Sequence, residues 1–378
     1  MTSCATDDWR APARALGPDV HVVVAMSGGV DSSVAALRVR EAGLRCSALF
    51  MKNWNEERTA GRCRWEDDVA DALAVCERLD IELNTVDLAQ AYWDGVFADF
   101  LAEYQRGRTP NPDVLCNREI KFKAFLDTAR AQGGDVIATG HYVRNDVREG
   151  RLRLMTGVDA NKDQSYFLYT LGQAQLARAL FPVGALPKSE VRRIARAAGL
   201  PNHEKKDSTG ICFIGERDFR DFLRQYVAAQ PGPVLSEDGR VLGAHHGAVF
   251  YTLGQREGLG IGGVRGADAA PWFVSAKDLA QNTLTVVQGH DHPALLRRSL
   301  VAIGLSWVDG APPALPVACT AKTRYRQAAA ACTVMAHADG AVAVVFAEPQ
   351  RAPTPGQSVV FYEGDVCLGG GVIETTAH

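Results

Sequence analysis

The segment Ser27–Ser33 reads Ser-Gly-Gly-Val-Asp-Ser-Ser and combines small, flexible and acidic residues. An apolar run, Val20–Met26, precedes it, and Val30, Val34 and Leu37 follow at helical spacing. A strand, a glycine-rich turn and a helix can bind phosphate, because glycines let the backbone close on an anion whose charge the helix N-terminus stabilises. No Gly-Lys-Ser/Thr follows the turn, so this is not a Walker A loop. The segment predicts a phosphate site, and an ordinary βα turn is the alternative.

Two of the nine cysteines lie in segments that favour chemistry. Cys116 closes the run Arg108–Asn117, whose two prolines predict a stiff loop rather than a helix, with Asp113 three residues from the thiol. Cys212 follows the basic pair Lys205–Lys206 in a glycine-punctuated segment. Nearby cations can lower the pKa of a thiol and make it a better nucleophile. The alternative for each cysteine is a buried small apolar residue.

Strand and helix patterns alternate over the first half of the chain. The predicted strands are Val20–Met26, Cys46–Phe50, Ile81–Val86 and Val136–Thr139, and the predicted helices are Asp31–Arg40, Glu66–Leu79, Tyr92–Tyr104 and Ile120–Arg130. Such a series predicts an α/β fold with a doubly wound parallel sheet, whose ligand lies at the carboxyl ends of the strands. Ser27–Ser33, Met51 and Gly140-His141 each follow a predicted strand. We therefore expect them on one active-site rim.

The second half changes character. Helices are expected at Ser189–Ala198 and Asp218–Ala228, and short β-type runs with turn signals follow from about residue 232. A hairpin turn is expected at Glu363-Gly364-Asp365. The predicted division is a loose N-terminal tail (1–18), a parallel-sheet domain that carries the phosphate turn (19–220), a small mixed domain (221–292) and a C-terminal β-barrel (293–378).

Composition narrows the class of protein. The 378 residues carry a formal net charge of −3, so any RNA must bind through local patches. No apolar run approaches the ~20 residues that cross a bilayer, and the polar N-terminus has no signal-peptide core. The odd cysteine count without metal-type spacing predicts a reducing, cytoplasmic location and no metal ligand set. Oligomeric state is unreadable, and a monomer is the default expectation.

These segments together resemble the tRNA-specific 2-thiouridylase family (MnmA/TrmU type) of the PP-loop ATP pyrophosphatases, which have an adenine nucleotide α-hydrolase-like fold. The resemblance covers about residues 20–376. It implies that domain 19–220 is an ATP-binding catalytic domain and that the β-barrel 293–378 contacts tRNA. It rests on Ala25–Ser33, Phe50–Trp54, Gly107–Phe122, Ala138–Tyr142, Lys162–Leu168, Ser208–Arg217, Tyr251–Gly263, Thr323–Arg326 and Pro355–Gly371. It implies ATP-dependent replacement of the C2 oxygen of a wobble uridine by sulfur, that is, a tRNA-uridine 2-sulfurtransferase. The tRNAs implied are those for Lys, Glu and Gln, and the implied sulfur donor is a cysteine desulfurase or a relay protein.

The resemblance also implies residue roles. Cys212 resembles the persulfide-carrying cysteine, Cys116 its nucleophilic and possible disulfide partner, and Asp113 the general acid/base beside the target base. The implied ATP contacts are Ala25, Met26, Ser27, Gly28, Gly29, Val30, Asp31, Ser32, Met51 and Gly140. The implied tRNA contacts are Asn111, Pro112, Asp113, His141, Lys162, Asp163, Gln164, Arg324, Tyr325 and Gln357. The alternatives are a solvated strand end at Thr323–Arg326, a polar loop at Lys162–Gln164 and a structural His141.

The chemistry explains why such groups are needed. Adenylation turns the C2 oxygen of uridine into a leaving group, and Mg²⁺ is expected to share the charge of the pyrophosphate. Asp31 would orient either that metal or the loop. Attack by Cys116 on a Cys212 persulfide would free hydrosulfide and leave a disulfide. Alternatively, the terminal sulfur attacks the base directly and Cys116 resolves the product. Either route predicts that the loop bearing Cys212 moves and that the base is flipped into a pocket.

Three other readings remain. Another PP-loop enzyme that adenylates tRNA or forms amides would share Ser27–Ser33 but has no need of Asn111–Cys116 together with Ser208–Cys212. An RNA-binding protein without catalysis would need none of Asp113, Cys116 and Cys212. The cysteine spacing disfavours a metal-binding protein.

Overall fold

The parallel sheet sits at the centre of the N-terminal half. The computed structural model describes residues 8–55, 64–207, 219–261 and 270–378. Within these residues five strands pair in the order β3-β2-β1-β4-β7, all parallel. Their bounds are β1 His21–Met26, β2 Arg45–Lys52, β3 Leu83–Asp87, β4 Val136–Ala138 and β7 Ala179–Leu180. The order in which successive strands are added reverses between β1 and β4. Doubly wound sheets bind ligands at this topological switch point.

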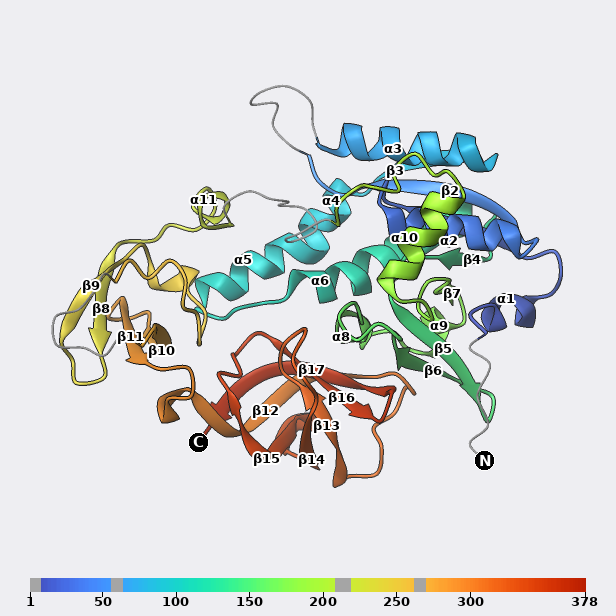
Figure 1. Cartoon of the computed structure of the whole chain (residues 1–378). Helices are drawn as coiled ribbons and strands as arrows, with labels where there is room; N and C mark the ends of the chain where they lie inside the picture. Colours follow the sequence, from blue (N-terminus) through green and yellow to red (C-terminus); the bar gives the residue numbers. More distant parts are fainter. Residues whose placement is uncertain (1–7, 56–63, 208–218, 262–269) are drawn as a thin grey trace.

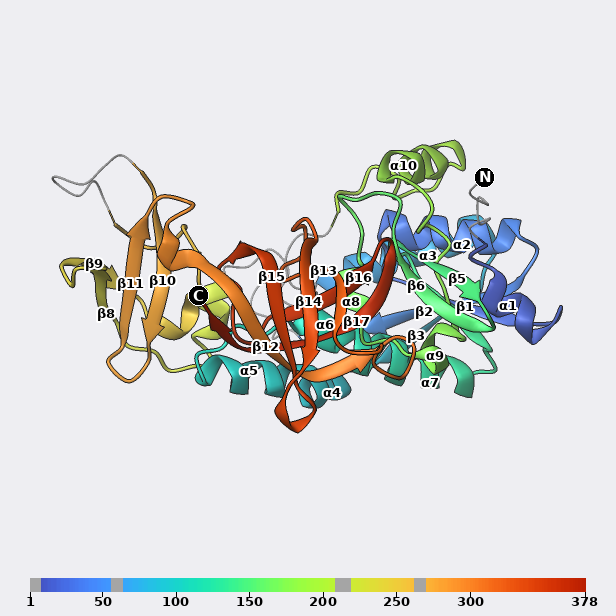
Figure 2. The same ribbon diagram turned by 90° about the horizontal axis from the view of Figure 1, so that it is seen from below.

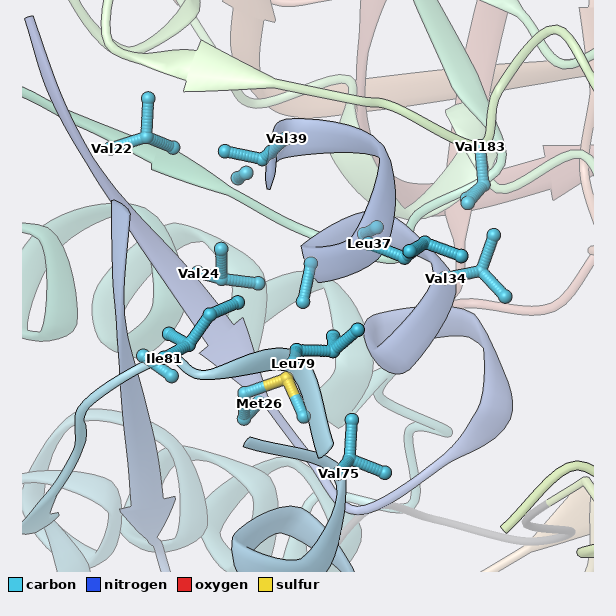
Figure 3. Packing of buried hydrophobic residues seen from close by; sticks show 14 of the residues in the cluster. Val22, Val24, Met26, Val34, Leu37, Val39, Val75, Leu79, Ile81 and Val183 are labelled. Carbon is cyan, nitrogen blue, oxygen red and sulfur yellow. The ribbon is translucent and has the colours of Figure 1, made fainter. Parts of the chain in front are cut away.

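Helices cover both faces of this sheet (Figure 1). On one face, Val22, Val24 and Met26 of β1 pack against α2, α3 and α10, as Figure 3 shows for part of this core. On the other face, Val23 packs with Phe125 and other residues of η2 and α7. Successive side chains of a strand point to opposite faces, so β1 is apolar on both. The bounds of these covering helices are α2 Val30–Glu41, α3 Arg64–Leu79, η2 Cys116–Ala124, α7 Phe125–Ala131 and α10 Lys188–Ala197.

The predicted strands and helices of this half are confirmed, with bounds shifted by a few residues, and two long helices have a different character. The predicted helix Tyr92–Tyr104 is α4, a π-helical segment and α5 in succession, and the predicted Ile120–Arg130 helix begins inside the π-helical segment η2. The bounds of the first three are α4 Ala89–Tyr92, η1 Trp93–Phe97 and α5 Ala98–Gln105. π-helical turns are rare in proteins overall, and those that occur are often found at functional sites.

The expectation of a stiff loop through Arg108–Asn117 is wrong for its second half. Residues Pro112–Leu115 form the helix α6, and η2 follows directly at Cys116. The side chain of Asn111 caps this helix by accepting the backbone N–H of Asp113 at 3.2 Å. A proline is compatible with the first helical turn, where its missing N–H has no partner to lose. The second proline therefore starts a helix instead of preventing one.

The middle part is a small mixed unit. Four strands of the described residues pair in the order β10-β11-β8-β9, and their core includes Phe97 and Phe100 from the long helical segment α4–α5. That segment runs from the parallel sheet to the middle sheet in Figure 1. The bounds are α11 Phe219–Leu223, β8 Gly232–Ser236, β9 Val241–His245, η3 Ala248–Phe250, β10 Trp272–Asp278 and β11 Thr283–Gln288.

The C-terminal part is a six-stranded antiparallel barrel within the described residues, in the order β12-β15-β14-β13-β16-β17 and closed by β12–β17 pairing. Figure 2 shows it between the middle sheet and the parallel sheet. The predicted hairpin at Glu363–Asp365 is confirmed, since Glu363 pairs with Val366. The bounds are η4 Pro293–Leu295, β12 Leu296–Trp307, β13 Val317–Lys322, β14 Ala330–Ala336, η5 Ala338–Gly340, β15 Val342–Arg351, β16 Ser358–Glu363 and β17 Val366–Ala377.

A hairpin from the N-terminal half extends this barrel sheet. The strands β5 (Val143–Arg148) and β6 (Arg151–Thr156) pair with each other, and β6 pairs with β17. The two-residue turn Glu149-Gly150 has positive φ at both positions, 52° and 76°. This is the turn geometry usually supplied by Asn-Gly or Asp-Gly, and a glutamate in the first position explains why the sequence did not reveal it.

Short helices lie near the N-terminus and before β7. Part of the expected loose tail is folded: α1 (Ala11–Leu16) buries Pro12 and Ala13, and the guanidinium of Arg38 lies 5.7 Å from the ring of Trp9. The short helices α8 (Ser165–Leu168) and α9 (Gln173–Leu176) link the hairpin to β7. Among the described helices, none has both the length and the apolar character needed to cross a bilayer.

Candidate active site

The turn Ser27–Ser33 joins β1 to α2 and is held in shape by its own side chains. The Ser32 hydroxyl donates to the carbonyl of Gly29 at 3.0 Å and accepts the backbone N–H of Ser27 at 3.2 Å. Gly28 has a φ of +73°, and a Cβ there would collide with the carbonyl oxygen of Asp68 in α3. Only glycine fits this position. The turn is therefore pre-formed, with the N-terminus of α2 available to an anion.

Gly140 lies against the same turn. It follows β4, and a Cβ on it would come within 2.8 Å of the backbone of Asp31 and of Ser32. The two turns after β1 and β4 thus meet at the carboxyl edge, as the strand pattern predicted. Met51 differs in detail: β2 continues to Lys52, so Met51 lies inside the strand rather than after it. It still packs at this edge, against the core clusters of the parallel and the middle sheets.

A segment after α10 clamps the turn from outside. The Asn202 amide donates to the carbonyl of Gly28 at 2.9 Å, and the Lys205 ammonium donates to the same oxygen at 3.3 Å. Lys205 also binds Asp68 at 2.7 Å and Asp71 at 2.6 Å. Burial lowers the pKa of Lys205, but the hydrogen bonds to the two aspartates outweigh it, so the pKa is raised and the ammonium stays charged.

The carboxylate of Asp31 faces two donors. The Tyr142 hydroxyl donates to Asp31 Oδ1 at 2.7 Å, and Lys188 Nζ lies 2.7 and 2.9 Å from the two carboxylate oxygens. Burial and the nearby negative charge of Asp31 raise the pKa of Tyr142. Tyr142 therefore remains a neutral hydrogen-bond donor. Neither residue was predicted to have a role: Tyr142 ends the segment Ala138–Tyr142 that resembles the family, but only Gly140 and His141 were singled out there, and Lys188 stands in none of these segments.

Asp207 is the second anion of this network. It binds Lys162 at 2.6 Å, Lys188 at 2.7 Å and Arg192 at 2.9 Å. Burial raises the pKa of Asp207, but its hydrogen bonds to Lys162 and Lys188 outweigh this and lower the pKa to about 2. Three cations thus gather next to the Ser27–Ser33 turn. Such a cluster favours binding of a polyanion.

The short helix α6 carries Asp113 in its first turn, where a carboxylate is favourable. Asp113 is half-buried, whereas Cys116 is fully buried and joins an apolar cluster with Tyr92 and Phe97. Val114 on the same helix packs in the core cluster of the parallel sheet. These contacts fix α6 at the sheet edge. Cys212, the second predicted cysteine, lies outside the described residues, so its predicted meeting with Cys116 stays a prediction.

The barrel holds the approach to α6. The Gln357 amide nitrogen donates to the carbonyls of Thr109 at 2.8 Å and Pro110 at 3.4 Å, and the Thr109 N–H donates to Pro355 at 3.0 Å. Gln357 was predicted to contact tRNA. Here its NH₂ group contacts the chain just before Asn111, and the tRNA contact stays a prediction.

His141 packs between rings behind the rim. Its Nδ1 lies 2.8 Å from the Thr139 hydroxyl, and Phe122 and Phe181 lie 5.8 and 6.5 Å away between ring centroids. Burial, followed by the positive charge of Lys121, lowers the pKa of His141 well below its usual value. The imidazole is therefore neutral at pH 7. A neutral ring can bind a base by stacking or hydrogen bonding but cannot neutralise a phosphate.

Asp163, which was predicted to contact tRNA, has its side chain buried inside the protein, and the tRNA contact stays a prediction. Its carboxylate is buried and accepts the N–H of Gly157 at 3.1 Å, the N–H and hydroxyl of Ser165 at 3.1 and 3.0 Å, and Lys322 Nζ at 3.0 Å. Both oxygens are used inside the protein. Asp163 thus ties its loop to the barrel strand β13, while Gln164 accepts the Tyr142 N–H at 2.9 Å.

Arg324 and Tyr325 lie where the three parts of the chain meet. One guanidinium nitrogen of Arg324 donates to the carbonyls of Leu253 at 2.8 Å and Ala352 at 2.9 Å, which joins the middle unit to the barrel. The Tyr325 ring lies 4.4 Å from that of Phe167 in α8. Arg324 is therefore largely committed to internal contacts, whereas the half-buried Tyr325 has the character of a stacking surface.

A protein-only metal centre is not part of this arrangement. No group of three or more His, Cys, Asp or Glu side chains in the described parts of the chain is placed to hold a metal ion. A divalent ion at the rim would share its coordination between a carboxylate and substrate phosphates, as Mg²⁺ commonly does.

Three family descriptions match consecutive parts of the chain. Residues 20–216 match the tRNA methyl transferase HUP domain, 220–288 the tRNA methyl transferase PRC-barrel domain and 297–373 the aminomethyltransferase beta-barrel domain. These ranges coincide with the parallel-sheet, middle and barrel parts of the structure.

Relatives of known name match this chain over nearly its whole length. The chain is 59% identical over 358 residues to the tRNA-specific 2-thiouridylase MnmA of Methylococcus capsulatus, covering 94% of this chain and 96% of that protein. It is 59% identical to MnmA of Stutzerimonas stutzeri, covering 94% of each chain. It is 57% identical to MnmA of Alcanivorax borkumensis, covering 95% of this chain and 98% of the relative. With this identity over nearly the whole length, the chain belongs to the tRNA-specific 2-thiouridylase family.

Proposed function

We propose that this chain forms 2-thiouridine at the wobble position of tRNA by adenylating the C2 oxygen with ATP and replacing it with sulfur carried on cysteine. The observation that supports the site assignment is the pre-formed turn Ser27–Ser33, which is in contact with Gly140, while Val114 of α6 packs in the core of the same sheet. The reaction itself follows from membership of the family. The residue roles below are our proposals.

ATP is placed with its phosphates on the turn. The backbone from Ser27 to Ser32 and the N-terminus of α2 would hold the leaving pyrophosphate, with Ala25, Met51 and Gly140 along the rest of the nucleotide. The Lys188 and Arg192 cations next to Asp207 would offset the phosphate charge. A Mg²⁺ ion shared by Asp31 and the phosphates would stabilise the charge that develops on pyrophosphate, and Lys188, which now binds both Asp31 oxygens, would have to share that carboxylate with it.

The target base is placed beside α6. Asn111 and Pro112 would frame the flipped uridine, and Asp113 would move the proton at the reacting base. Tyr325 would stack on the anticodon loop, and Lys162 and Gln164 would contact its backbone. His141, being neutral, would contact a base rather than a phosphate.

Sulfur would arrive as a persulfide on Cys212. Attack by Cys116 on that persulfide releases hydrosulfide and leaves a Cys116–Cys212 disulfide, which a thiol must later reduce. In the alternative route the terminal sulfur attacks the adenylated carbon and Cys116 then resolves the covalent product. Both routes use the same two cysteines and differ in which sulfur bonds to the base.

The biological setting is also a proposal. We propose a cysteine desulfurase or sulfur-relay protein as the sulfur donor, tRNAs for Lys, Glu and Gln as the acceptors, and a monomer acting in the cytoplasm. Thiolated nucleosides released from each purified tRNA would identify the acceptors.

The test is a reconstituted reaction. Purified protein, unmodified tRNA, ATP-Mg²⁺ and a desulfurase with cysteine are incubated, and the digested tRNA is searched for 2-thiouridine by mass spectrometry. We expect product only with ATP, and none from Cys116→Ser, Cys212→Ser or Asp113→Asn. Cys46→Ser, which changes a cysteine of β2 away from α6, is the matched control and should keep activity. ATP cleavage to AMP without a thionucleoside would instead favour another PP-loop enzyme.

Supplying sulfide in place of the desulfurase tests whether Cys212 serves only to carry sulfur to the site. If Cys212 only carries sulfur, Cys212→Ser regains part of its activity with sulfide, while Asp113→Asn does not. Full activity of Cys116→Ser with the desulfurase would contradict the two-cysteine route.

A further inference from the structure

The barrel holds a second pair of facing cysteines. Cys319 in β13 is directly opposite Cys332 in β14, and their Sγ atoms lie 3.7 Å apart. Opposite residues of antiparallel strands have Cα atoms about 4.5 or 5.5 Å apart. Disulfides span Cα distances of about 4.4–6.8 Å. The backbone therefore already has a spacing that a disulfide accepts, and bond formation needs only small side-chain rotations.

The two thiols differ in environment. Cys332 is 6% exposed and packs in the barrel core with Val334 and Phe346, whereas Cys319 is half-buried at the edge of this core. The hydrogen bond from Cys332 lowers the pKa of Cys319 against the effect of burial, and the same bond raises the pKa of Cys332. Cys319 is therefore the more accessible thiol and the more readily deprotonated one.

We propose that Cys319 and Cys332 form a redox-active dithiol, which a low-molecular-weight disulfide such as oxidised glutathione converts reversibly to an intrachain disulfide. The Cys319 thiolate attacks one sulfur of the oxidant, forming a mixed disulfide and releasing one thiol. Cys332 then loses its proton, attacks the Sγ of Cys319 and releases the second thiol. Two electrons pass from the protein to the oxidant, which becomes two thiols.

The position of this bond gives it a consequence for the fold. The strands β13 and β14 flank the connection that carries Arg324 and Tyr325, and Lys322 at the end of β13 binds Asp163. A covalent link across the two strands would fix the base of that connection. Because a cross-link restricts the unfolded chain, we expect the oxidised protein to melt at a higher temperature than the reduced protein. This site goes beyond the proposed sulfur transfer and does not involve Cys116 or Cys212.

Peptide mapping tests the proposal directly. The full-length chain is incubated with oxidised glutathione, its remaining thiols are alkylated, and it is digested with trypsin without reduction. Trypsin cuts after Lys322, Arg324 and Arg326, so the peptides with Cys319 and Cys332 separate unless a disulfide joins them. We expect the joined pair at a mass two hydrogens below the sum of the peptides, and its loss on reduction with dithiothreitol.

Two controls keep the outcome independent of the catalytic cysteines. The same map of a Cys116→Ser/Cys212→Ser variant should retain the joined pair, and in the wild-type chain the peptide masses alone distinguish it from a Cys116–Cys212 bond. Cys46 and Cys76, for which burial raises the thiol pKa, should stay fully alkylated. Recovery of Cys319 and Cys332 as separately alkylated peptides, under conditions that form a glutathione adduct on any other thiol, overturns the proposal.

Discussion

The Lys188 ammonium lies 2.7 Å from the carboxylate of Asp31, which stands in the first turn of α2, directly after the glycine-rich turn. The same nitrogen lies 2.7 Å from Asp207, and its side chain is 12% exposed. One cation thus separates two carboxylates at the place proposed for the triphosphate. Without Lys188, the carboxylates of Asp31 and Asp207 would face the proposed triphosphate with no lysine between them.

This arrangement predicts that Lys188→Met weakens ATP binding. A charge-assisted hydrogen bond contributes about 1.5–3 kcal/mol, so the Kd for ATP-Mg²⁺ should rise about 10- to 100-fold. Isothermal titration calorimetry measures it. Arg193→Met is the matched control, because Arg193 lies on the same helix, pairs with Glu190 at the surface and should leave the Kd unchanged. An unaltered Kd for Lys188→Met would place the triphosphate elsewhere.

The strands and the glycine-rich turn could be predicted from the sequence because their signals are local, whereas phosphate binding by the turn stays a prediction. The run Val20–Met26 is apolar on both faces, and the pair Gly28-Gly29 lies directly between this strand pattern and a helical pattern. Lys188 and Tyr142 reach Asp31 only through the fold, at sequence separations of 157 and 111 residues. No local pattern distinguishes such residues from surface lysines or core tyrosines.

What the sequence did not reveal at Pro112 and Asp163 has equally physical causes. Pro112 was taken as a sign of a loop, but a proline after an asparagine cap starts a helix without losing a hydrogen bond. Asp163 stands in a segment that resembles a tRNA-contacting motif, yet the fold turns its carboxylate inward to Lys322. A motif indicates which segment could carry function. The direction of each side chain depends on the tertiary structure and cannot be predicted from the motif.

The neutral His141 predicts a pH dependence of stability. Its pKa is lowered by folding, so below the ordinary value of about 6.5 the unfolded chain takes up a proton that the folded chain does not. Stability should therefore fall as the pH drops from about 7 to about 5.5. The slope should stay below the limit of ~1.4 kcal/mol per pH unit for one group, since the unfolded imidazole is only partly protonated near its ordinary pKa.

Urea unfolding at the two pH values measures this effect. The His141→Asn variant cannot titrate at this position, so its free energy of unfolding should change less between them than that of the wild type. Equal changes in the two proteins would mean that other groups carry the dependence.

Gln357 is predicted to act by positioning α6. Gln357→Ala removes the hydrogen bonds to Thr109 and Pro110, worth about 1 kcal/mol each or less, and should slow thiolation several-fold. If positioning dominates, the Kd for tRNA should change less than about threefold. Gel-shift titration and the thiolation rate together separate the two roles. Gln132→Ala, on an exposed glutamine of the parallel-sheet part, is the control. A Kd that rises in parallel with the loss of rate would favour a direct tRNA contact.

The buried pair of Lys322 and Asp163 predicts a large effect on stability. The two side chains are 18% and 4% exposed, and their atoms lie 3.0 Å apart. Lys322→Met would leave a buried carboxylate without its cation, which costs about 3–5 kcal/mol when one partner of such a pair is removed. The hydrogen bonds that Asp163 receives from Gly157 and Ser165 remain, so we expect the lower end of this range. Chemical denaturation measures the change.

The double variant Lys322→Met/Asp163→Asn decides whether charge is the cause. A neutral amide of the same size needs no cation, so the double variant should be more stable than Lys322→Met alone, although it loses the attraction between the two charges. Lys322→Arg, which keeps the positive charge, should cost much less than Lys322→Met. If Lys322→Arg and Lys322→Met were equally destabilising, the packing of the lysine stem would matter more than its charge, and Asp163 would not depend on β13 to hold its loop.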